Sequence, residues 1–507
     1  MKMKFLLGLA VAFFAVNAAF ALPSDRIVTN GVIEEFKNFS KNPHCTFHES
    51  DATKYMAEKF KKIGASVVVD EHGNVIADLP ATKGLEKVPT LIFQGHIDMV
   101  CAHSESFDPI SMPIKIVVKD GVMTTDGNSS LGADDMINIA AVTWLFENEK
   151  FNHGKIRFIW TVSEEVGLVG ARKLDAKYLQ DAKYMINLDG FSLGRIVTGS
   201  AGGTRETYTK KVKLVKTSSD MNAFKVKVSG MKGGHSGYDI NKQRANANKY
   251  LATFLYSQLE KHAVQLVSMQ GGEAHNVIPR DSEAIVVVPN KYSDEFLNDV
   301  SNFDRVLKKA YALSENGANV SIEKTLVPQN AIDTNSGKMV LSFMTLVDNG
   351  VYETMQIYPH LPDTSSNMGL VKTENDLVTV TFMIRNSDVL YRDNVVANHK
   401  AAADLCDFDR IVTQYESWQP DKNNPLAVTV ANAYKKVSGK DAVLSAEHIG
   451  IEPSAFVGKN PDLIIVSTGI GVHDAHSLTE SCDVKDLPTF VKTMKETIFQ
   501  ISKEWHK

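Results

Sequence analysis

The sequence predicts an α/β protein, in which a doubly wound domain carries a second, α+β domain inserted into it. Short apolar runs of strand length alternate with stretches of helical periodicity at both ends of the chain, whereas the middle follows a different order. The chain has 507 residues and 43% hydrophobic content. Because single cores stop growing near roughly 250–300 residues, two domains are expected.

The elements of the first domain begin with apolar residues at helical spacing from Arg26 to about Gly64. Strand-like runs follow, and the continuously apolar ones are typical of buried strands. These runs cover residues 65–70, 74–79, 90–94, 155–162, 184–188 and, far downstream, 463–468. A helix is expected from near Asp134 through Leu145. Ligands of such sheets gather beyond the carboxyl ends of the strands.

The middle of the chain, from about Glu206 to Gln419, is interpreted as the inserted domain. Its first half contains a strand at 222–229, a Gly-rich turn at 233–237, a helix to about 259 and a strand pair ending at 284–288. A similar order recurs from Lys338, with a strand pair that includes 377–384, a helix near 395–405 and a strand at 410–415. We interpret this recurrence as a degenerate internal duplication of a ferredoxin-like unit.

The first 21 residues have the features of a secretory signal peptide. Two lysines precede an apolar run from Phe5 to Val16, and Ala19-Phe20-Ala21 supplies a cleavage site. A membrane-spanning helix needs about 20 apolar residues, so a retained anchor is the weaker alternative, and no later run is long enough. The sequence thus predicts an exported protein, periplasmic or secreted after cleavage near Ala21. The expected division is signal peptide 1–21, first domain 22–205 and 420–507, and inserted domain 206–419.

Charge and cysteine content exclude some classes of partner. The formal net charge is -5 and the basic residues form no block, so a nucleic-acid partner is not expected. The expected partner is a small molecule. None of the four cysteines lies in a C-x-x-C pair, so zinc binding by thiolates is unsupported. Their pairing stays open; they are Cys45, Cys101, Cys406 and Cys482.

Acidic and imidazole side chains follow four of the predicted strands. They are His96 with Asp98, Glu164 with Glu165, Asp189, and His476, and Asp134 is added at the start of the predicted helix. Taken alone, Asp134 is an ordinary N-cap and the glutamate pair an ordinary solvated strand end. Taken together, these groups supply the nitrogen and oxygen ligands that divalent cations need at one edge of a sheet. The sequence therefore predicts a metal site.

Five segments carry a resemblance to a known family. They are Gly95–Val100, Leu131–Asp135, Thr161–Gly167, Asn187–Asp189 and His476-Ser477, and their pattern resembles the carboxypeptidase G2/aminoacylase/dipeptidase superfamily of co-catalytic zinc hydrolases. Residues 234–237, 276–280 and 448–452 resemble its bacterial aminoacyl-histidine dipeptidase branch. The likeness covers nearly the whole chain after residue 21. One departure is Asp135, where that branch usually carries Asn.

The resemblance implies a zinc-peptidase catalytic domain, an inserted lid domain and two divalent metal ions, zinc first, with manganese or cobalt as alternatives. It assigns His96 and Asp189 to one metal, Glu165 and His476 to the other, and Asp134 to both. Asp98 would hold the ring of His96, and Glu164 would be the general base.

The same resemblance implies the substrate-binding residues. His235 would stabilise the oxyanion and Arg385 would clamp a substrate carboxylate, although a structural turn His and a surface Arg are the alternatives. Asn276 and Glu452 are also expected at the substrate. The predicted function is hydrolysis of short unblocked dipeptides, Xaa-His or broader, by a monomer or homodimer. An N-acyl-amino-acid amidohydrolase of the same fold and a non-catalytic periplasmic binding protein are the alternatives.

Overall fold

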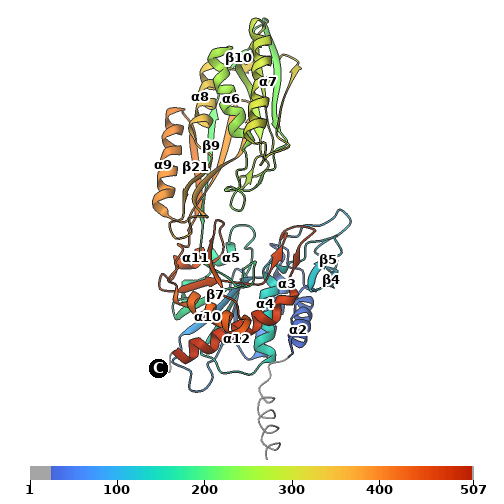
Figure 1. The fold of residues 1–507 in the computed structure, drawn as a ribbon, viewed down its shortest axis with the longest axis vertical. Coiled ribbons are helices and arrows are strands. Elements are labelled where there is room, and N and C mark those ends of the chain that lie inside the picture. Colours follow the sequence, from blue (N-terminus) through green and yellow to red (C-terminus); the bar gives the residue numbers. More distant parts are fainter. Residues whose placement is uncertain (1–23, 505–507) are drawn as a thin grey trace, which may run out of the picture. The chain divides into compact units, whose positions relative to one another are not determined.

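The computed structural model describes residues 24–504 (Figure 1). The predicted signal segment, residues 1–21, lies outside the described residues. The chain divides into two compact units. Unit 1 comprises residues up to 198, 421–445 and those from 455 on, whereas unit 2 comprises 199–420 and 446–454. Within the described range, no helix combines the length and apolar character needed to cross a membrane.

Unit 1 is built around an eight-stranded sheet of the described residues. In order across the sheet, the strands are β1 (Ser66–Val69), β2 (Val75–Leu79), β6 (Ile156–Thr161), β3 (Thr90–His96), β7 (Ala182–Asn187), β23 (Ile464–Ser467), β8 (Arg195–Ser200) and β22 (Val443–Glu447). The central strands β6, β3, β7 and β23 are parallel. Every residue of β3 and β6 is buried, which explains their continuous apolar runs. The carboxyl ends of these four strands meet at one edge.

Helices bury the main core of unit 1 against this sheet. They are α2 (Asp25–Phe39), α3 (Ser50–Ile63), α4 (Ala133–Asn148), α10 (Pro425–Ser438) and α12 (Leu487–Glu504). The ring of Phe158 in β6 lies 4.5 Å from that of Phe60 in α3 and 5.0 Å from that of Phe146 in α4, so both helices cover the same face. Helix α4 is buried on all sides from its start to Phe146, as expected of a helix that is apolar all round.

Shorter elements complete unit 1. A four-stranded antiparallel sheet consists of β24 (Val472–His473), β25 (Ser481–Cys482), β5 (Val122–Thr125) and β4 (Ile116–Lys119). The short helices are α5 (Val169–Lys173) and the 3₁₀ turns 176–178 and 484–486. A further short helix, α11 (Pro453–Val457), begins in unit 2 and continues into unit 1 at residue 455. Through the pairing of β25 with β5, the chain that follows His476 lies beside the chain that leads into α4.

Unit 2 is built on a nine-stranded antiparallel sheet of the described residues. Its strands, in order, are β16 (Asn319–Thr325), β11 (Met221–Ser229), β15 (Ser282–Pro289), β13 (Gln265–Gly271), β19 (Pro362–Glu374), β20 (Leu377–Asn386), β9 (Gly202–Lys211) and β21 (Asp409–Tyr415), and β18 (Gly350–Thr354) pairs with β19. Four helices share one core with it: α6 (Ala247–Lys261), α7 (Ser293–Ala310), α8 (Thr334–Leu346) and α9 (Val389–Leu405). Two small ladders pair β12 (Gly234–His235) with β14 (Val277–Ile278) and β10 (Leu214–Lys216) with β17 (Asn330–Ile332).

The two halves of the unit 2 sheet have the same order of elements. One half runs β11, α6, β13, β15, α7, β16, and the other runs β9, α8, β19, β20, α9, β21. Corresponding strands occupy mirrored positions across the sheet, a pattern expected of an internal duplication. Lys338, where the second half was expected to begin, lies inside α8. The strand that opens this half is β9, far earlier in the sequence, so the repeat is not contiguous.

Candidate metal centre

Six ionisable side chains of unit 1 lie at or just after the ends of parallel strands, at the start of α4 or in the loop between β24 and β25. His96 is the last residue of β3, Glu164 and Glu165 follow β6, Asp189 follows β7, Asp134 lies in the first turn of α4, and His476 lies between β24 and β25. The structure therefore brings all the predicted metal ligands and the predicted base to one edge of the sheet. For His96, Glu164, Glu165 and Asp189 this placement follows from the parallel direction of the central strands.

Two sets of potential metal ligands share Asp134. Ligand atoms of His96, Asp134 and Asp189 all lie within 4.8 Å of one another, and the same holds for Asp134, Glu165 and His476. Oδ1 of Asp134 is 3.3 Å from Nε2 of His96, whereas Oδ2 is 3.1 Å from Nε2 of His476. A third set at this spacing joins His96 with Glu164 and Glu165. Asp134 thus offers one oxygen to each imidazole, as a bridging carboxylate must.

The donor chemistry of these residues fits divalent cations. Nδ1 of His96 lies 2.9 Å from the backbone carbonyl oxygen of Asp98, which can only accept, so this nitrogen carries the proton. Burial opposes protonation of this ring, but its hydrogen bonds to Asp134 and Asp98 raise the pKa of His96 well above its ordinary value. A divalent cation bound here would take the place of the proton on Nε2, and neutral imidazole with carboxylates is a donor set that zinc accepts.

Burial and mutual repulsion shift the pKa values of these carboxylates. Burial raises the pKa of Asp189 well above its ordinary value, and the charge of Asp134 raises it further. Burial alone would raise the pKa of Asp134, but hydrogen bonds with His476 and His96 lower it. Burial alone would lower the pKa of His476. Its contacts with Asp134 and Glu165 outweigh burial and raise this pKa to about 10. Several buried negative charges at one place favour a site for cations.

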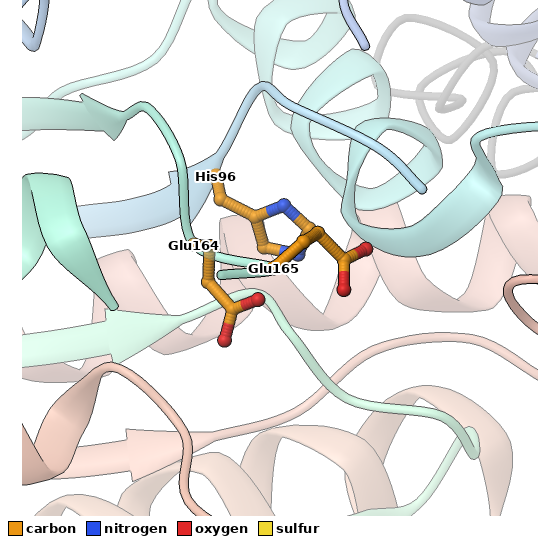
Figure 2. Close-up of side chains that lie close together, drawn as sticks. All are labelled: His96, Glu164 and Glu165. Carbon is orange, nitrogen blue, oxygen red and sulfur yellow. The ribbon is translucent and has the colours of Figure 1, made fainter. Parts of the chain in front are cut away.

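Asp98 organises the chain around the two glutamates. Its Oδ1 accepts the backbone N–H of Glu164 at 2.9 Å, and its Oδ2 accepts that of Glu165 at 3.3 Å. The backbone carbonyl oxygen of Asp98 lies closer to Nδ1 of His96, at 2.9 Å, than the carboxylate Oδ1 of Asp98 does, at 3.6 Å. The carboxylates of Glu164 and Glu165 lie on different sides of the His96 ring (Figure 2). Asp98 therefore fixes the backbone from which two adjacent carboxylates diverge.

Two further contacts shape this edge of the sheet. Ser163 has a positive φ of 53°, and Glu49 holds it there by accepting its backbone N–H and its hydroxyl, each at 3.0 Å. Asp135 is buried against β3, since a Cβ on Gly95 would stand 2.1 Å from its Oδ2. The extra negative charge of Asp135 contributes to the raised pKa of Asp189, after burial and Asp134.

Comparison with known proteins identifies the family. The model of peptidase family M20/M25/M40 matches residues 92–500, which include both sets of ligands. The chain belongs to this family. It is 28% identical over 473 residues to the cytosol non-specific dipeptidase of Escherichia coli (strain K12), a match that covers 92% of this chain and 96% of the relative.

Solved structures agree with this assignment. The aminoacylhistidine dipeptidase from Vibrio alginolyticus matches with a TM-score of 0.83 at 26% identity, over 93% of this chain and 96% of that chain. The aminopeptidase PepT from Bacillus cereus, with a TM-score of 0.56 at 18% identity over 93% and 98% of the two chains, shares the fold. The predicted resemblance, the α/β fold class and the prediction of a metallopeptidase are confirmed. A non-catalytic binding protein is thereby excluded.

The expectation of an exported, periplasmic or secreted protein is wrong. The relative that matches 92% of this M20 peptidase is named as an enzyme of the cytosol. The expectation depended on residues 1–21 alone, which lie outside the described residues. An apolar run behind two lysines does not by itself determine export.

The predicted substrate-binding residues of this M20 peptidase all lie in unit 2. The guanidinium of Arg385, at the end of β20, donates to the hydroxyls of Ser236 at 3.2 Å and Tyr415 at 3.4 Å. It also lies 3.2 Å from Nε2 of His235. Asn276 joins the same region, since its carbonyl accepts the backbone N–H of Ser236 at 2.9 Å.

Residues 446–454, which were expected with the second part of the catalytic domain, group with unit 2. The reason lies in their hydrogen bonds: Ala201 donates its N–H to the carbonyl of Glu447 at 2.9 Å, and the ring of His448 lies 2.7 Å from the hydroxyl of Ser365. Glu452 is fully buried in this segment. Burial, followed by the charges of Arg385 and His235, lowers the pKa of His448 to about 3.

Sequence reasoning missed residues whose side chains hold the segments of the predicted site residues in place. Glu49, Thr46 and Glu480 each bind a segment that carries a predicted ligand or base. It also left the cysteines open, of which Cys45 and Cys101 form a disulfide while Cys406 and Cys482 are free and buried. Of the three missed residues, only Glu480 had a signal in the sequence, which was its position four residues after the predicted ligand His476.

Proposed function

We propose that this M20 peptidase is a two-metal dipeptidase that hydrolyses short, unblocked dipeptides of the Xaa-His type or broader. The observation that carries the proposal is Asp134, whose two oxygens face the imidazoles of two separate ligand sets. The substrate class is supported by two relatives that are named dipeptidases and match 92% and 93% of the chain.

Each of the two ligand sets that share Asp134 is assigned to one metal ion. His96 and Asp189 would hold one cation, Glu165 and His476 would hold the other, and Asp134 would contribute to both sites. Zinc is the first assignment, with manganese or cobalt as alternatives, because nitrogen and oxygen donors suit all three. When bound, the two cations polarise the scissile carbonyl and acidify the attacking water.

Glu164 is the general base in this proposal. Its neighbour Glu165 belongs to the ligand set with Asp134 and His476. We assign to the carboxylate of Glu164 the transfer of a proton from water to the leaving amine. Asp98 accepts the backbone N–H of Glu164, so the backbone that carries the base is held before substrate binds. Pre-organisation of this kind is what efficient proton transfer requires.

The residues with expected roles in substrate binding lie in unit 2. Arg385 binds the substrate α-carboxylate, because its planar fork suits bidentate binding and its partners Ser236 and Tyr415 are uncharged hydroxyls. His235 donates a hydrogen bond to the oxyanion that forms during attack. Asn276 and Glu452 complete the predicted set.

A panel of matched peptides tests this function. Free, N-acylated and C-amidated forms of the same dipeptides are incubated with protein that has been loaded with Zn²⁺, and hydrolysis is measured by chromatography. Free dipeptides should be cleaved, and activity should disappear on chelation and return with Zn²⁺. Cleavage of the acylated forms alone would overturn the dipeptidase in favour of an amidohydrolase.

A further inference from the structure

Glu480 is a buried carboxylate that binds the start of helix α4. The side chain is 2% exposed. Its Oε2 accepts the backbone N–H groups of Leu131 at 2.9 Å and Gly132 at 3.1 Å, and its Oε1 accepts those of Ala133 at 2.8 Å and Asp134 at 3.4 Å. Four consecutive N–H groups therefore converge on one carboxylate.

The local backbone explains this convergence. Gly132, the N-cap of α4, has a φ of 71° and a ψ of 31°, which turns successive N–H groups toward the same side. A Cβ at this position would stand 2.7 Å from Sδ of Met99, so glycine is needed both for conformation and for space. The first N–H groups of a helix lack partners within it, and Glu480 supplies them from a distant part of the chain.

Glu480 is itself held in place. The hydroxyl of Thr124 in β5 donates to its backbone carbonyl at 2.8 Å, and β25 begins at the next residue, Ser481. Four residues before it lies His476, a member of the second ligand set. Glu480 thus joins a fixed strand, the segment with one imidazole ligand and the segment with the shared carboxylate.

We propose that Glu480 is a positioning residue of the metal centre. By binding the N–H groups of residues 131–134, its carboxylate sets the place of Asp134 relative to His476. The proposal rests on the function proposed above, because it assumes that Asp134 binds metal. Outer contacts of this kind usually change metal affinity by about 10–100-fold when they are removed.

Glu480→Gln tests the proposal, because it keeps the shape of the side chain but replaces an acceptor oxygen with an NH₂ group that faces N–H donors. Zn²⁺ binding to the metal-free protein is measured by titration calorimetry, and its thermal unfolding is recorded separately. We expect a loss of Zn²⁺ affinity of about 10–100-fold and a lower kcat at saturating Zn²⁺ with little change in KM. Unchanged Zn²⁺ affinity in the folded variant would overturn the proposal.

Glu35→Gln is the matched control. Glu35 is also a buried carboxylate of unit 1, but it accepts hydrogen bonds from Tyr55 and Lys59, which are not predicted ligands. Glu35→Gln should lower the unfolding temperature and leave the Zn²⁺ affinity unchanged. If it lost as much Zn²⁺ affinity as Glu480→Gln, the effect would belong to any buried carboxylate. If Glu480→Gln does not fold, Thr124→Val is measured instead, because it removes the hydrogen bond to the backbone carbonyl of Glu480. We expect this variant to lose Zn²⁺ affinity by less than about tenfold, and an unchanged Zn²⁺ affinity would refute the proposal. Wild-type protein that binds no Zn²⁺ would overturn both proposals.

Discussion

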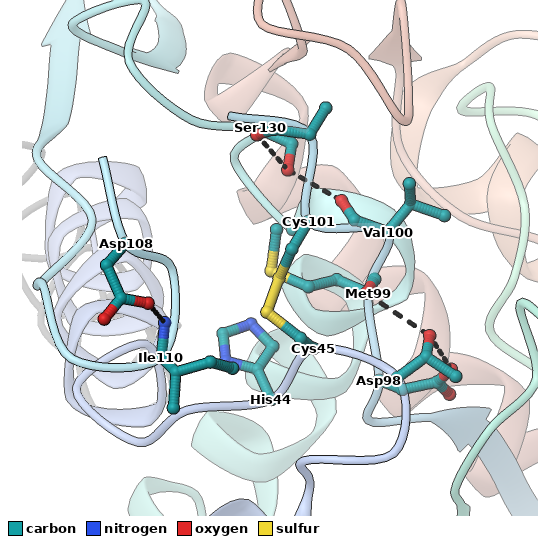
Figure 3. Close-up of a disulfide and its surroundings, with 12 residues drawn as sticks. His44, Cys45, Asp98, Met99, Val100, Cys101, Asp108, Ile110 and Ser130 are labelled. Carbon is teal, nitrogen blue, oxygen red and sulfur yellow. Dashed lines mark hydrogen bonds between the residues drawn. A yellow bond between two sulfur atoms is a disulfide. The ribbon is translucent and has the colours of Figure 1, made fainter. Parts of the chain in front are cut away.

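The hydroxyl of Thr46 donates a hydrogen bond of 2.8 Å to Oδ2 of Asp98. The neighbouring residue Cys45 forms the disulfide with Cys101, which closes a loop over a sequence separation of 56 residues (Figure 3). Backbone hydrogen bonds from Thr46 to Met99 and from Met99 to His44 run beside it. The disulfide therefore ties the loop that carries Asp98 to the segment whose hydroxyl binds this carboxylate.

Reduction of the disulfide should destabilise unit 1. In the chain-entropy description, a cross-link that closes a loop of this length stabilises the folded state by roughly 4 kcal/mol, as an upper value. The oxidised and reduced proteins are compared by urea unfolding. We expect a lower urea midpoint after reduction, together with a lower kcat because Asp98 loses part of its support.

A double Cys45→Ser, Cys101→Ser variant separates the disulfide from other effects of the reductant. This variant should already unfold at the lower urea concentration and should not respond further to reductant. A further response would assign the effect to another group, such as the reductant acting on bound metal. Equal midpoints for oxidised and reduced wild type would contradict the prediction.

The two adjacent glutamates should respond differently to the same substitution. Glu164→Gln should retain its metal and lose about 10²–10⁴-fold in kcat, because a positioned proton transfer contributes this much. Glu165→Gln should instead lose metal, because Glu165 belongs to the set with Asp134 and His476. Metal content by elemental analysis and kcat are measured on both variants. Metal loss from Glu164→Gln with retention in Glu165→Gln would support the set that joins His96 to Glu164.

The apolar runs of the sequence predict the four parallel strands, and the parallel direction then places His96, Glu165 and Asp189 at one edge. Side chains at the ends of strands can be located in this way because strand direction is a property of the backbone. The contact of Glu480 could not be found, since it joins backbone N–H groups that only the conformation of Gly132 turns toward it. The grouping of His448 with unit 2 depends on tertiary hydrogen bonds, for which the sequence has no periodic signal.

His448 should make the stability of the protein depend on pH. Its pKa is lowered from 6.5 to about 3 in the folded chain, first by burial and then by Arg385 and His235. Between these values only the unfolded chain binds the proton, so the stabilising contribution is complete above about pH 6.5 and is lost as the pH falls toward 3. From pH 6.5 to pH 5 the expected loss is roughly 2 kcal/mol.

His448→Gln isolates this effect, because glutamine does not titrate and keeps a group that can bond to the hydroxyl of Ser365. The free energy of unfolding of wild type relative to the variant is measured by urea at pH 7, 6 and 5. The difference should shrink or reverse as the pH falls, whereas the titration of other residues affects both proteins alike. A constant difference over this range would contradict a buried neutral His448.

Arg385 should restrict hydrolysis to substrates with a free carboxylate near the scissile bond. Loss of one partner from a buried, hydrogen-bonded charge pair costs on the order of 2–5 kcal/mol, so an amidated dipeptide should be cleaved about 30-fold to several thousandfold less efficiently than its free acid. Arg385→Ala should lower kcat/KM for the free acid by a similar factor and affect the amide far less, since that interaction is already missing. Arg385→Lys keeps the charge but not the planar fork, and should recover part of the loss. Because Arg385 also contacts Ser236 and Tyr415, the folding of each variant is checked by thermal unfolding. Equal losses for acid and amide in folded Arg385→Ala protein would show that the residue supports the fold and does not bind the carboxylate.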